Sequence, residues 1–414
     1  MNKTENRKFK VGIFGAWRGS AFIPIFESFE EFEITAVCDK SAERIKKALG
    51  ALARNVECYD DFDRFIESGI DAVVLCNYFH EHAEYAIKAL KKGIHVFSET
   101  MAAPTPALCV ALCRAVEESG CIYMLAENYP FFSACAELTR VCKRGGLGEI
   151  VFCEGEYVHP MSPSDEKKYG LPELNGKYHW RRFLPATYYS SHSLAPLMCA
   201  TGLMPKKVIG KAAPQPPELM RENNRTKGDA IGVMLVEMDN GAIFRISGSA
   251  YIGTHGNWYR ISGMNGSAET VRGDEKKVRV HYNAWSVPEG EEQDITYRTE
   301  FKTDKAKAEK FGHGGGDYYV VKKFLQALKS GKNYKPLDVY HAVAMAAVAI
   351  FGWRSAINGS KEMKIPNFRL ERVRKKWEND NLTPFPDENG MSTLPYTVHN
   401  AELSYEIVEK PWTS

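Results

Sequence analysis

The first 125 residues alternate short apolar runs with stretches in which apolar positions recur at helical spacing. Runs such as "KVGIFGA", "FEITAVCD" and "DAVVLCN" have the length and composition of buried strands. Between them lie amphipathic segments such as "SAERIKKALG" and "HAEYAIKALKKG", which carry helix-starting and helix-ending residues at their ends. Strands separated by helices of this length predict right-handed crossovers and a parallel, doubly wound sheet.

After Glu127 the pattern changes to longer alternating runs. "EIVFCEGEYVHP", "IGVMLVEMDNGAIFRISGSA" and "WYRISGMNGSAETVRG" are typical of strands, and "DNG" and "NG" mark tight hairpin turns between them. Two helical patterns follow, over residues 317–331 and 337–359. From about residue 380 the chain is rich in Pro and Asn and shows weak periodicity.

These patterns predict an α/β chain of two domains, which suits its 414 residues. Residues 1–126 are expected to form the doubly wound parallel sheet with its helices. Residues 127–380 are expected to form an α+β domain with a large, mostly antiparallel sheet that has one open face. Residues 381–414 are expected to form a C-terminal arm.

Charge and apolar composition indicate which classes of partner the protein is not expected to bind. The chain has 54 Lys and Arg against 52 Asp and Glu, interleaved along its length, for a net charge of +2. We therefore expect no nucleic-acid partner and no membrane surface. The polar start leads into a short strand without a signal-peptide pattern, and no apolar run is expected to reach the roughly 18 residues that cross a bilayer. A cytoplasmic location is predicted.

The turn after the first strand carries glycines and is followed by a carboxylate. Gly15 ends "KVGIFG", Gly19 follows in "AWRGSAF", and Asp39 closes the second strand 24 residues after Gly15. Such glycines let backbone amides approach a pyrophosphate, and the carboxylate accepts ribose hydroxyls. Asp39 would repel a 2'-phosphate, which favours NAD over NADP. Because Trp17 stands where a second glycine is expected, and Gly19 falls one position early, an ordinary strand-to-helix turn is the alternative.

An ordered set of segments resembles the family of glucose-fructose oxidoreductase, inositol dehydrogenase and MocA (Gfo/Idh/MocA). The set includes "ITAVCD", "HAEYAIKALKKGIHVFSET", "GGLGEIVFCEGEY" and "GHGGGDYYVVKKFLQAL", and it spans about residues 8–370. The resemblance implies an N-terminal Rossmann domain that binds NAD(P) and a C-terminal α/β domain with an open sheet. It also implies sugar-like substrates held at the nicotinamide, and dimers or tetramers formed through that sheet.

Two positions depart from the pattern of that family. Its members typically carry Glu-Lys-Pro after the fifth strand, and an Asp four residues before a His, where the lysine and histidine handle the proton of the alcohol. Here Glu99 is followed by Thr100 and Met101, and Tyr188 takes the aspartate position before His192. The base that is missing at Thr100 is therefore expected from the second domain.

A subgroup that also lacks the lysine is similar around "LAENYPF", "GEYVHP" and "YYSSHSLAP". These are the NAD-dependent glycoside hydrolases of the α-N-acetylgalactosaminidase type. The similarity implies that Glu127, Tyr157 and His192 contact the sugar and its leaving group, with Tyr259 as a looser match. In that cycle hydride transfer to NAD oxidises carbon 3, a base removes the neighbouring carbon-bound hydrogen, the glycosidic group leaves, water adds and the hydride returns.

The predicted catalytic residues are His192, Tyr157, Tyr189 and Glu127. His192 titrates near neutrality and can take the proton of the sugar hydroxyl. Tyr157 or Tyr189 could accept a proton if a neighbouring cation lowered its pKa, and Glu127 could be an acid or base if desolvation raised its own. The structural alternatives are a satisfied histidine, a capping carboxylate at a hinge, and a tyrosine in packing or subunit contact.

The remaining candidates divide between cofactor and substrate. Cofactor contacts are assigned to Gly15, Trp17, Arg18, Gly19, Asp39, Asn77, His82, Glu99 and Thr100. Substrate contacts are assigned to Arg181, Arg182, Tyr259 and His313. A solvated basic loop is the alternative for the two arginines, and a helix cap with a glycine-permitted turn, shared with Asp317, is the alternative for His313. No metal site is expected, because His80 and His82 at a helix start point in different directions.

The sequence thus predicts an NAD-dependent enzyme that acts on a sugar or glycoside by hydride transfer at a ring carbon. Redox-neutral cleavage of a glycoside is favoured. A net sugar or polyol dehydrogenase that makes a keto-sugar is one alternative, and a catalytically silent NAD-binding regulator is another. The apolar strands of the second domain predict a homo-oligomer, either a dimer or a tetramer.

Overall fold

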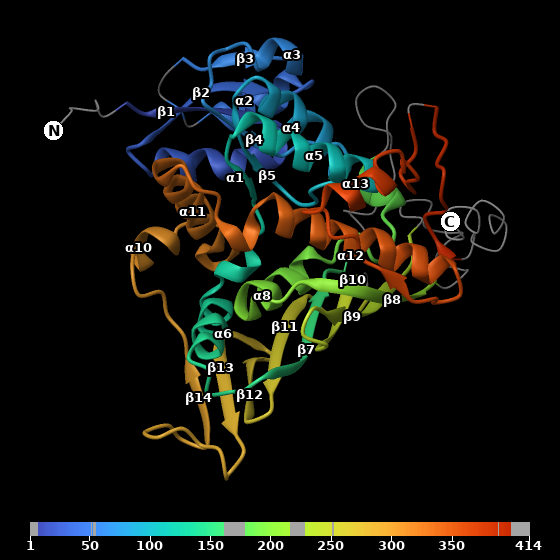
Figure 1. Cartoon of the computed structure of the whole chain (residues 1–414). Helices are drawn as coiled ribbons and strands as arrows, with labels where there is room; N and C mark the ends of the chain where they lie inside the picture. The colour runs from blue at the N-terminus through green and yellow to red at the C-terminus, as the bar shows by residue number, and fades with distance from the viewer. Residues whose placement is uncertain are drawn as a thin grey trace.

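The chain folds around two β-sheets, seen in a computed structural model at the top and bottom of Figure 1. The structure describes residues 7–50, 52, 55–160, 179–215, 228–250, 252–387 and 389–398. One continuous hydrophobic core reaches from the first sheet to the second. The part of the predicted arm beyond residue 398 lies outside the described residues.

The first sheet has six parallel strands in the order β3-β2-β1-β4-β5-β6, as predicted. Its strands are β1 (Phe9–Phe14), β2 (Phe32–Cys38), β3 (Glu57–Tyr59), β4 (Ala72–Leu75), β5 (His95–Ser98) and β6 (Tyr123–Leu125). The helices between them are α1 (Ala16–Glu27), α2 (Ala42–Leu49), α3 (Phe62–Phe65), α4 (His82–Lys91) and α5 (Pro106–Ser119). The strand order reverses between β1 and β4, so a crevice opens at their carboxyl ends, where α/β sheets bind ligands.

Local signals in the sequence start these helices. Ser41 caps α2 and Thr105 caps α5, each accepting a backbone N–H of the first turn. Gly15 precedes α1 with a φ of 92°, and a Cβ there would lie 2.5 Å from the backbone of Cys76. Only glycine therefore lets the turn after β1 lie against the end of β4.

The second sheet has nine strands in the order β14-β13-β12-β11-β7-β10-β9-β8-β15. They are β7 (Ile150–Val158), β8 (Pro205–Ala213), β9 (Ile231–Met238), β10 (Ile243–Ala250), β11 (Gly256–Gly263), β12 (Gly266–Val271), β13 (Asp274–Tyr282), β14 (Asp294–Arg298) and β15 (Met363–Lys364). Pairing is antiparallel except between β7 and β10, which confirms the prediction of a mostly antiparallel sheet.

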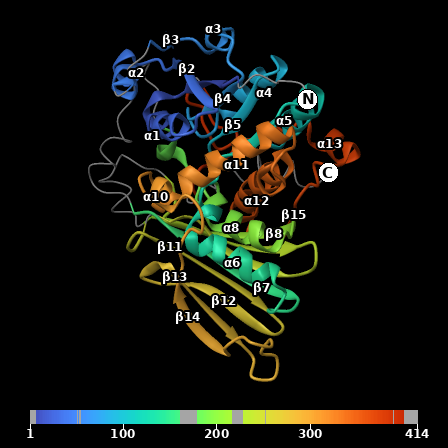
Figure 2. The ribbon, with the colours of Figure 1, turned by 90° about the vertical axis from the view of Figure 1, so that its left-hand side faces the viewer.

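Helices cover one face of the second sheet and fill the space between the two sheets. The longer ones are α6 (Ser133–Lys143), α8 (Ser191–Thr201), α11 (Gly316–Ser330) and α12 (Val339–Ile357). The shorter ones are η1 (Tyr129–Phe131), η3 (Trp180–Phe183), α10 (Lys305–Ala308), η4 (His313–Gly315), η5 (Lys335–Leu337) and α13 (Glu371–Trp377). Figures 1 and 2 show α11 and α12 between the sheets, with α6 and α8 along the second sheet.

The segment Lys335–Ile357, which ends with α12, is long and apolar enough to cross a membrane by length and composition. The expectation that no apolar run reaches this length was therefore wrong. In the fold, 83% of its most apolar window is buried. The helix contacts α5 on one side and β8 on the other, so its apolar residues belong to the core between the sheets.

Close packing of α8 on the second sheet places the start of this helix beside the first sheet. Gly155 on β7 faces α8, and a Cβ at Gly155 would overlap the carbonyl oxygen of Ser193. The hydroxyl of Tyr259 on β11 donates to the carbonyl oxygen of His192 at 2.6 Å. These two contacts fix the distance of the first turn of α8 from the sheet and its rotation about the helix axis.

A side chain at residue 155 should push α8 away from its strand. We expect Gly155→Ala to lower the free energy of unfolding by about 1–3 kcal/mol, because overpacking forces the backbone to shift. Urea unfolding followed by circular dichroism measures the change. Gly256→Ala is the matched control, since its added methyl group would meet open space on the same sheet. Equal stabilities of the two variants would contradict the assigned role of Gly155.

Candidate active site

A cleft of about 720 Å³ lies at the carboxyl ends of the first sheet and extends to the second sheet. It begins near Asp39 and Asp60 and ends near His255 and Glu275. The predicted site residues that line it are Gly15, Trp17, Arg18, Asp39, Asn77, His82, Glu99, Thr100, Tyr157, Arg181, Tyr189, His192 and His313. Residues 100 or more positions apart are therefore brought to one cavity.

The nucleotide half of the cleft contains the predicted carboxylate in a fixed position. Asp39 accepts the backbone N–H groups of Ala16 and Ser41, each at 2.8 Å. The Oδ1 atom of Asn77, just after β4, is buried without a hydrogen-bond partner among the described residues. A buried polar atom of this kind calls for a ligand donor or a water. With the close turn at Gly15, these features fit a dinucleotide laid across the switch point of the sheet.

The structure separates the two other predicted residues of the glycine turn, Gly19 and Trp17. Gly19 does not line the cleft, and a Cβ there would overlap the side chain of Ile13. The predicted cofactor contact is therefore corrected: Gly19 lets α1 pack closely on β1. Trp17, in contrast, is 51% exposed on the wall of the cleft, and its ring lies edge-on to His179 with centroids 6.4 Å apart.

His82 connects the loops that follow β4 and β5. Its Nε2 lies 3.3 Å from the carbonyl oxygen of Asn77, and its Nδ1 lies 3.3 Å from that of Met101. Burial lowers the pKa of His82, although the nearby Glu99 acts in the opposite direction. The ring is thus a buried positioning group that also contributes to the wall of the nucleotide half.

At Thr100, where the resemblance implied a lysine, the structure has a pair of hydroxyls. Thr100 Oγ1 lies 2.7 Å from Ser191 Oγ at the start of α8, and both side chains are buried. Neither hydroxyl is a base near neutral pH. The pair instead ties the loop after β5 to the helix that carries His192.

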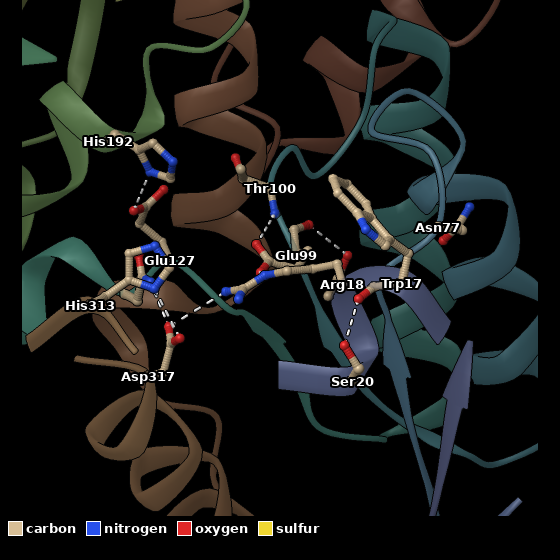
Figure 3. A network of polar contacts seen from close by, with 12 residues as sticks. Trp17, Arg18, Ser20, Asn77, Glu99, Thr100, Glu127, His192, His313 and Asp317 are labelled. Carbon is tan, nitrogen blue, oxygen red and sulfur yellow. Dashed lines mark hydrogen bonds and ion pairs between the residues drawn. The ribbon is translucent and has the colours of Figure 1, made fainter. Parts of the chain in front are cut away.

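His192 and Glu127 form a buried pair on the substrate side of the cleft, as Figure 3 shows. Their Nδ1 and Oε1 atoms are 2.7 Å apart. An ionised carboxylate only accepts, so Nδ1 carries a proton and Nε2 remains available as an acceptor. Glu127 does not itself line the cleft, and its second oxygen is buried without a partner among the described residues. Its position supports His192 as the predicted base.

Three tyrosines surround the ring of His192. Tyr129 stacks on it with centroids 4.2 Å apart, and Tyr157 and Tyr189 approach edge-on at 4.7 Å. Burial raises the pKa of Tyr129 and that of Tyr189, even though Arg181 beside Tyr189 acts in the opposite direction. The hypothesis that a cation makes Tyr189 a base is therefore corrected, because burial outweighs the cation and keeps the phenol protonated.

A second histidine–carboxylate pair borders the same cleft (Figure 3). His313 Nδ1 lies 2.9 Å from Asp317 Oδ2, and Asn128 Nδ2 donates to the other carboxylate oxygen at 2.6 Å. Arg18 reaches Asp317 at 3.5 Å and donates from its Nε to Glu99 at 2.7 Å. The first domain thus contributes a cation to the carboxylate that orients His313.

This network changes the acidity of its members. Burial alone would raise the pKa of Asp317, but the hydrogen bond from His313 and the charge of Arg18 lower it to about 2. The same hydrogen bond raises the pKa of His313 above its ordinary value, against the effect of burial. His313 is therefore more often protonated near neutral pH than an ordinary histidine.

Of the other predicted substrate contacts, one lines the cleft and two are buried away from it. Arg181 lines the cleft, with its guanidinium 4.4 Å from the ring centre of Trp180 and 5.1 Å from that of Tyr189. Arg182 is buried and does not line the cleft, so that prediction is corrected. Tyr259 is also buried away from the cleft, where its hydroxyl holds the backbone of His192, and its role is positional.

Sequence reasoning missed several residues of the cleft. Tyr129 was available in "ENYPF", two residues after Glu127, but no pattern indicates that its ring stacks on a histidine 63 positions later. Asn128 was likewise not predicted, and its place in the site follows from its hydrogen bond to Asp317. Arg18 was predicted as a cofactor contact, but its pairing with Asp317 was not. Among the described residues, no group of three or more His, Cys, Asp or Glu side chains is arranged to hold a metal ion.

The pKa of His313 should depend on the charge of Asp317. We expect Asp317→Asn to lower the midpoint of the His313 titration, because the raised value requires a carboxylate on Nδ1. Proton NMR of the ring protons, assigned with His313→Asn, measures the midpoint. Asp294→Asn is the control, since Asp294 faces the exposed His281 at 3.6 Å far from the cleft. An unchanged His313 midpoint would show that the pair is not coupled.

Comparison with known proteins finds family models that match two segments of the chain. Residues 9–127 match the Gfo/Idh/MocA model, described as an oxidoreductase family with an NAD-binding Rossmann fold. Residues 252–379 match the C-terminal domain of glycosyl hydrolase 109. The relatives include glycosyl hydrolase family 109 proteins from Solibacter usitatus and Stenotrophomonas maltophilia. The first is 23% identical over 90% of each chain, and the second is 22% identical over 87% of this chain and 89% of its own.

Solved structures show the same fold. An oxidoreductase domain protein from Kribbella flavida has a TM-score of 0.72 at 20% identity and covers 87% of this chain and 100% of its own. Levoglucosan dehydrogenase, in complex with NADH and levoglucosan, has a TM-score of 0.71 at 19% identity with the same coverage. Residues 9–127 therefore belong to the Gfo/Idh/MocA family of oxidoreductases with an NAD-binding Rossmann fold, and the same polypeptide carries a segment that matches the C-terminal domain of glycosyl hydrolase 109.

Proposed function

We propose that the protein is an NAD-dependent enzyme that cleaves a glycoside by a redox-neutral route. The observation that carries this proposal is the presence of two histidine–carboxylate pairs, His192–Glu127 and His313–Asp317, in a cleft whose lysine position is Thr100. The glycosyl hydrolase family 109 relatives support the same reaction class.

The number of proton transfers distinguishes cleavage from simple oxidation. Net oxidation of an alcohol removes one hydroxyl proton. Cleavage by elimination also removes a carbon-bound proton next to the new carbonyl and protonates the leaving oxygen, after which water adds. Two histidines with separate carboxylates supply more acid–base groups than one oxidation requires.

Each pair suits a different proton transfer. His192 Nε2 has no hydrogen-bond partner among the described residues, and Glu127 stabilises the ring as an imidazolium, so His192 removes the proton of the ring hydroxyl. His313, whose pKa is raised by Asp317, is the better proton donor and serves the leaving oxygen. The phenol of Tyr189, whose pKa burial raises, donates a hydrogen bond to an oxygen atom of the sugar, and Tyr157 lines the same cleft.

The cofactor would be held by the nucleotide half of the cleft, through Asp39, Asn77 and the turn at Gly15. When bound, NAD supplies a hydride acceptor that can later return the hydride to the same sugar. Arg18 and Glu99 form an ion pair between the nucleotide half and the sugar half of the cleft. Each charge thereby has a partner next to the reacting carbon.

A net sugar dehydrogenase is the second candidate. The fold that the chain shares with levoglucosan dehydrogenase favours this reading, because that structure holds NADH and a sugar derivative in one protein. The absence of lysine at residue 100 disfavours it, since oxidation would then rely on His192 alone.

A panel of nitrophenyl glycosides tests the proposal directly. We expect nitrophenol release without accumulation of NADH when both absorbances are followed in one cuvette. His192→Ala should abolish release, and Glu127→Gln should lower kcat by about 10²–10⁴-fold, because the imidazole loses its anionic partner. Accumulating NADH without nitrophenol would establish the dehydrogenase, and NAD binding without turnover on any sugar would favour a regulator.

We further propose that the open face of the second sheet binds a second copy of the chain. Leu235 on β9 and Ile243 on β10 project from this face, 44% and 37% exposed. Arg245 and Glu154 form an ion pair beside them at 2.7 Å. An apolar patch framed by satisfied charges is the composition of a subunit interface.

The patch can be tested by introducing charge. We expect the double variant Leu235→Arg and Ile243→Arg to sediment as a monomer, because two unpaired cations would have to be buried. Analytical ultracentrifugation measures the mass, with Glu289→Arg on an exposed loop as the control. A monomeric wild type would refute the interface.

A further inference from the structure

The segment predicted as a C-terminal arm packs against a loop of the nucleotide half of the cleft. In its described part, Phe385 is 3% exposed, and its ring stacks on that of His80 with centroids 4.7 Å apart and an interplanar angle of 7°. His80 belongs to residues 76–81 between β4 and α4, here called the β4–α4 loop. We propose that Phe385 is a positioning residue that holds this loop in the conformation that NAD requires. The inference rests on the NAD-binding part of the proposed function.

The β4–α4 loop forms one wall of the nucleotide half. All of its residues except His80 line the cleft. Among them is Asn77, whose buried Oδ1 calls for a donor from a ligand or a water. Phe385 does not itself line the cleft, so it can act on the cofactor only through the loop.

Phe385 contacts the middle of the loop and also the segment before α8. Besides stacking on His80, its ring lies 6.2 Å from that of Phe79 and edge-on to Tyr188 at 5.3 Å, measured between centroids. Phe79 stacks in turn on Trp180 with centroids 4.6 Å apart. Aromatic pairs at these separations attract each other in preferred orientations. Loss of the Phe385 ring would therefore remove one support from Phe79 and a stacking partner from His80.

The segment that carries Phe385 is itself attached to the core helix α12. Before Phe385, the two terminal nitrogens of Arg354 donate to the two carboxylate oxygens of Asp380, each at 2.7 Å. After it, Trp353 Nε1 donates to the carbonyl oxygen of Pro395 at 2.8 Å, and Leu394 is buried. Phe385 is thus held on both sides along the chain, and it is a fixed support for the β4–α4 loop.

A positioning role and simple core packing have different consequences. A loop that is already ordered loses less conformational entropy when a ligand binds, so the support should raise the affinity for NAD. Core packing alone would contribute to the stability of the fold without a specific effect on NAD. The affinity for NAD, compared at a similar loss of stability, therefore separates the two roles.

Titration of NAD into the full chain in a calorimeter tests the inference without turnover. We expect Phe385→Ala to weaken NAD binding at least about tenfold, because binding must then also order the loop. Phe368→Ala is the matched control, since Phe368 is equally buried, lies outside the cleft and loses the same side chain. Its affinity should stay within about twofold of the wild type. Phe385→Leu, which keeps much of the apolar volume but not the planar ring, gives the same comparison if Phe385→Ala does not fold.

Hydrogen exchange of the NAD-free protein shows where the effect arises. We expect the backbone amides of residues 77–81 to exchange faster in Phe385→Ala than in the wild type, because local opening of the loop becomes easier. In Phe368→Ala these amides should exchange as in the wild type. Unchanged exchange of the loop in Phe385→Ala would overturn the inference.

The outcomes separate this inference from the proposed glycosidase. Weakened NAD binding in Phe385→Ala alone, without turnover of any glycoside by the wild type, would support the positioning role and refute the glycosidase. Turnover by the wild type, with equal NAD affinities in the wild type and Phe385→Ala, would overturn the positioning role and leave the glycosidase standing. Equal weakening in Phe385→Ala and Phe368→Ala would also overturn it, because the effect would then follow from lost stability.

Discussion

The hydrogen bond between Glu127 and His192 is the contact on which the cleft depends. Glu127 follows the last strand of the first sheet, and His192 lies in the first turn of α8 on the second sheet. Both side chains are buried, and a buried carboxylate without a partner would cost several kcal/mol. The first sheet and helix α8 on the second sheet must therefore pack together for this pair to form. Their packing creates the walls of the cavity. Thr100 with Ser191, and Arg18 with Asp317, join the same two parts on either side of the pair.

Burial decides what each group at this junction can do. Tyr129 and Tyr189 are removed from water, so their phenols keep their protons and act as donors. Asp317 is equally enclosed, but His313 and Arg18 keep it ionised, and it in turn holds a proton on His313. In the same low-dielectric surroundings, the two phenols stay neutral because no cation lies close enough to ionise them. Asp317 stays charged because it has two cationic neighbours, His313 and Arg18.

Two features of the cleft depend on the absence of a side chain. Gly19 lets α1 pack closely on β1 next to the nucleotide half of the cleft. Gly155 lets α8 pack closely on β7, which positions His192. Neither glycine touches the cavity. Both glycines can be read directly in the sequence. The contacts that they permit, with Ile13 and Ser193, are tertiary contacts that a sequence pattern does not specify.

The sequence by itself determined the order of strands and helices, the parallel first sheet, the turn at Gly15, the carboxylate at Asp39 and the lack of a lysine at residue 100, because these depend on local periodicity, turn chemistry and residue identity. Only the tertiary structure decided that Arg182 and Tyr259 lie outside the cleft, that Tyr129, Asn128 and His159 lie within it, and that burial overrides a nearby cation at Tyr189. Side-chain direction, burial and the distance between remote residues follow from how α8 and α11 pack against the two sheets, and packing is a property of the whole chain.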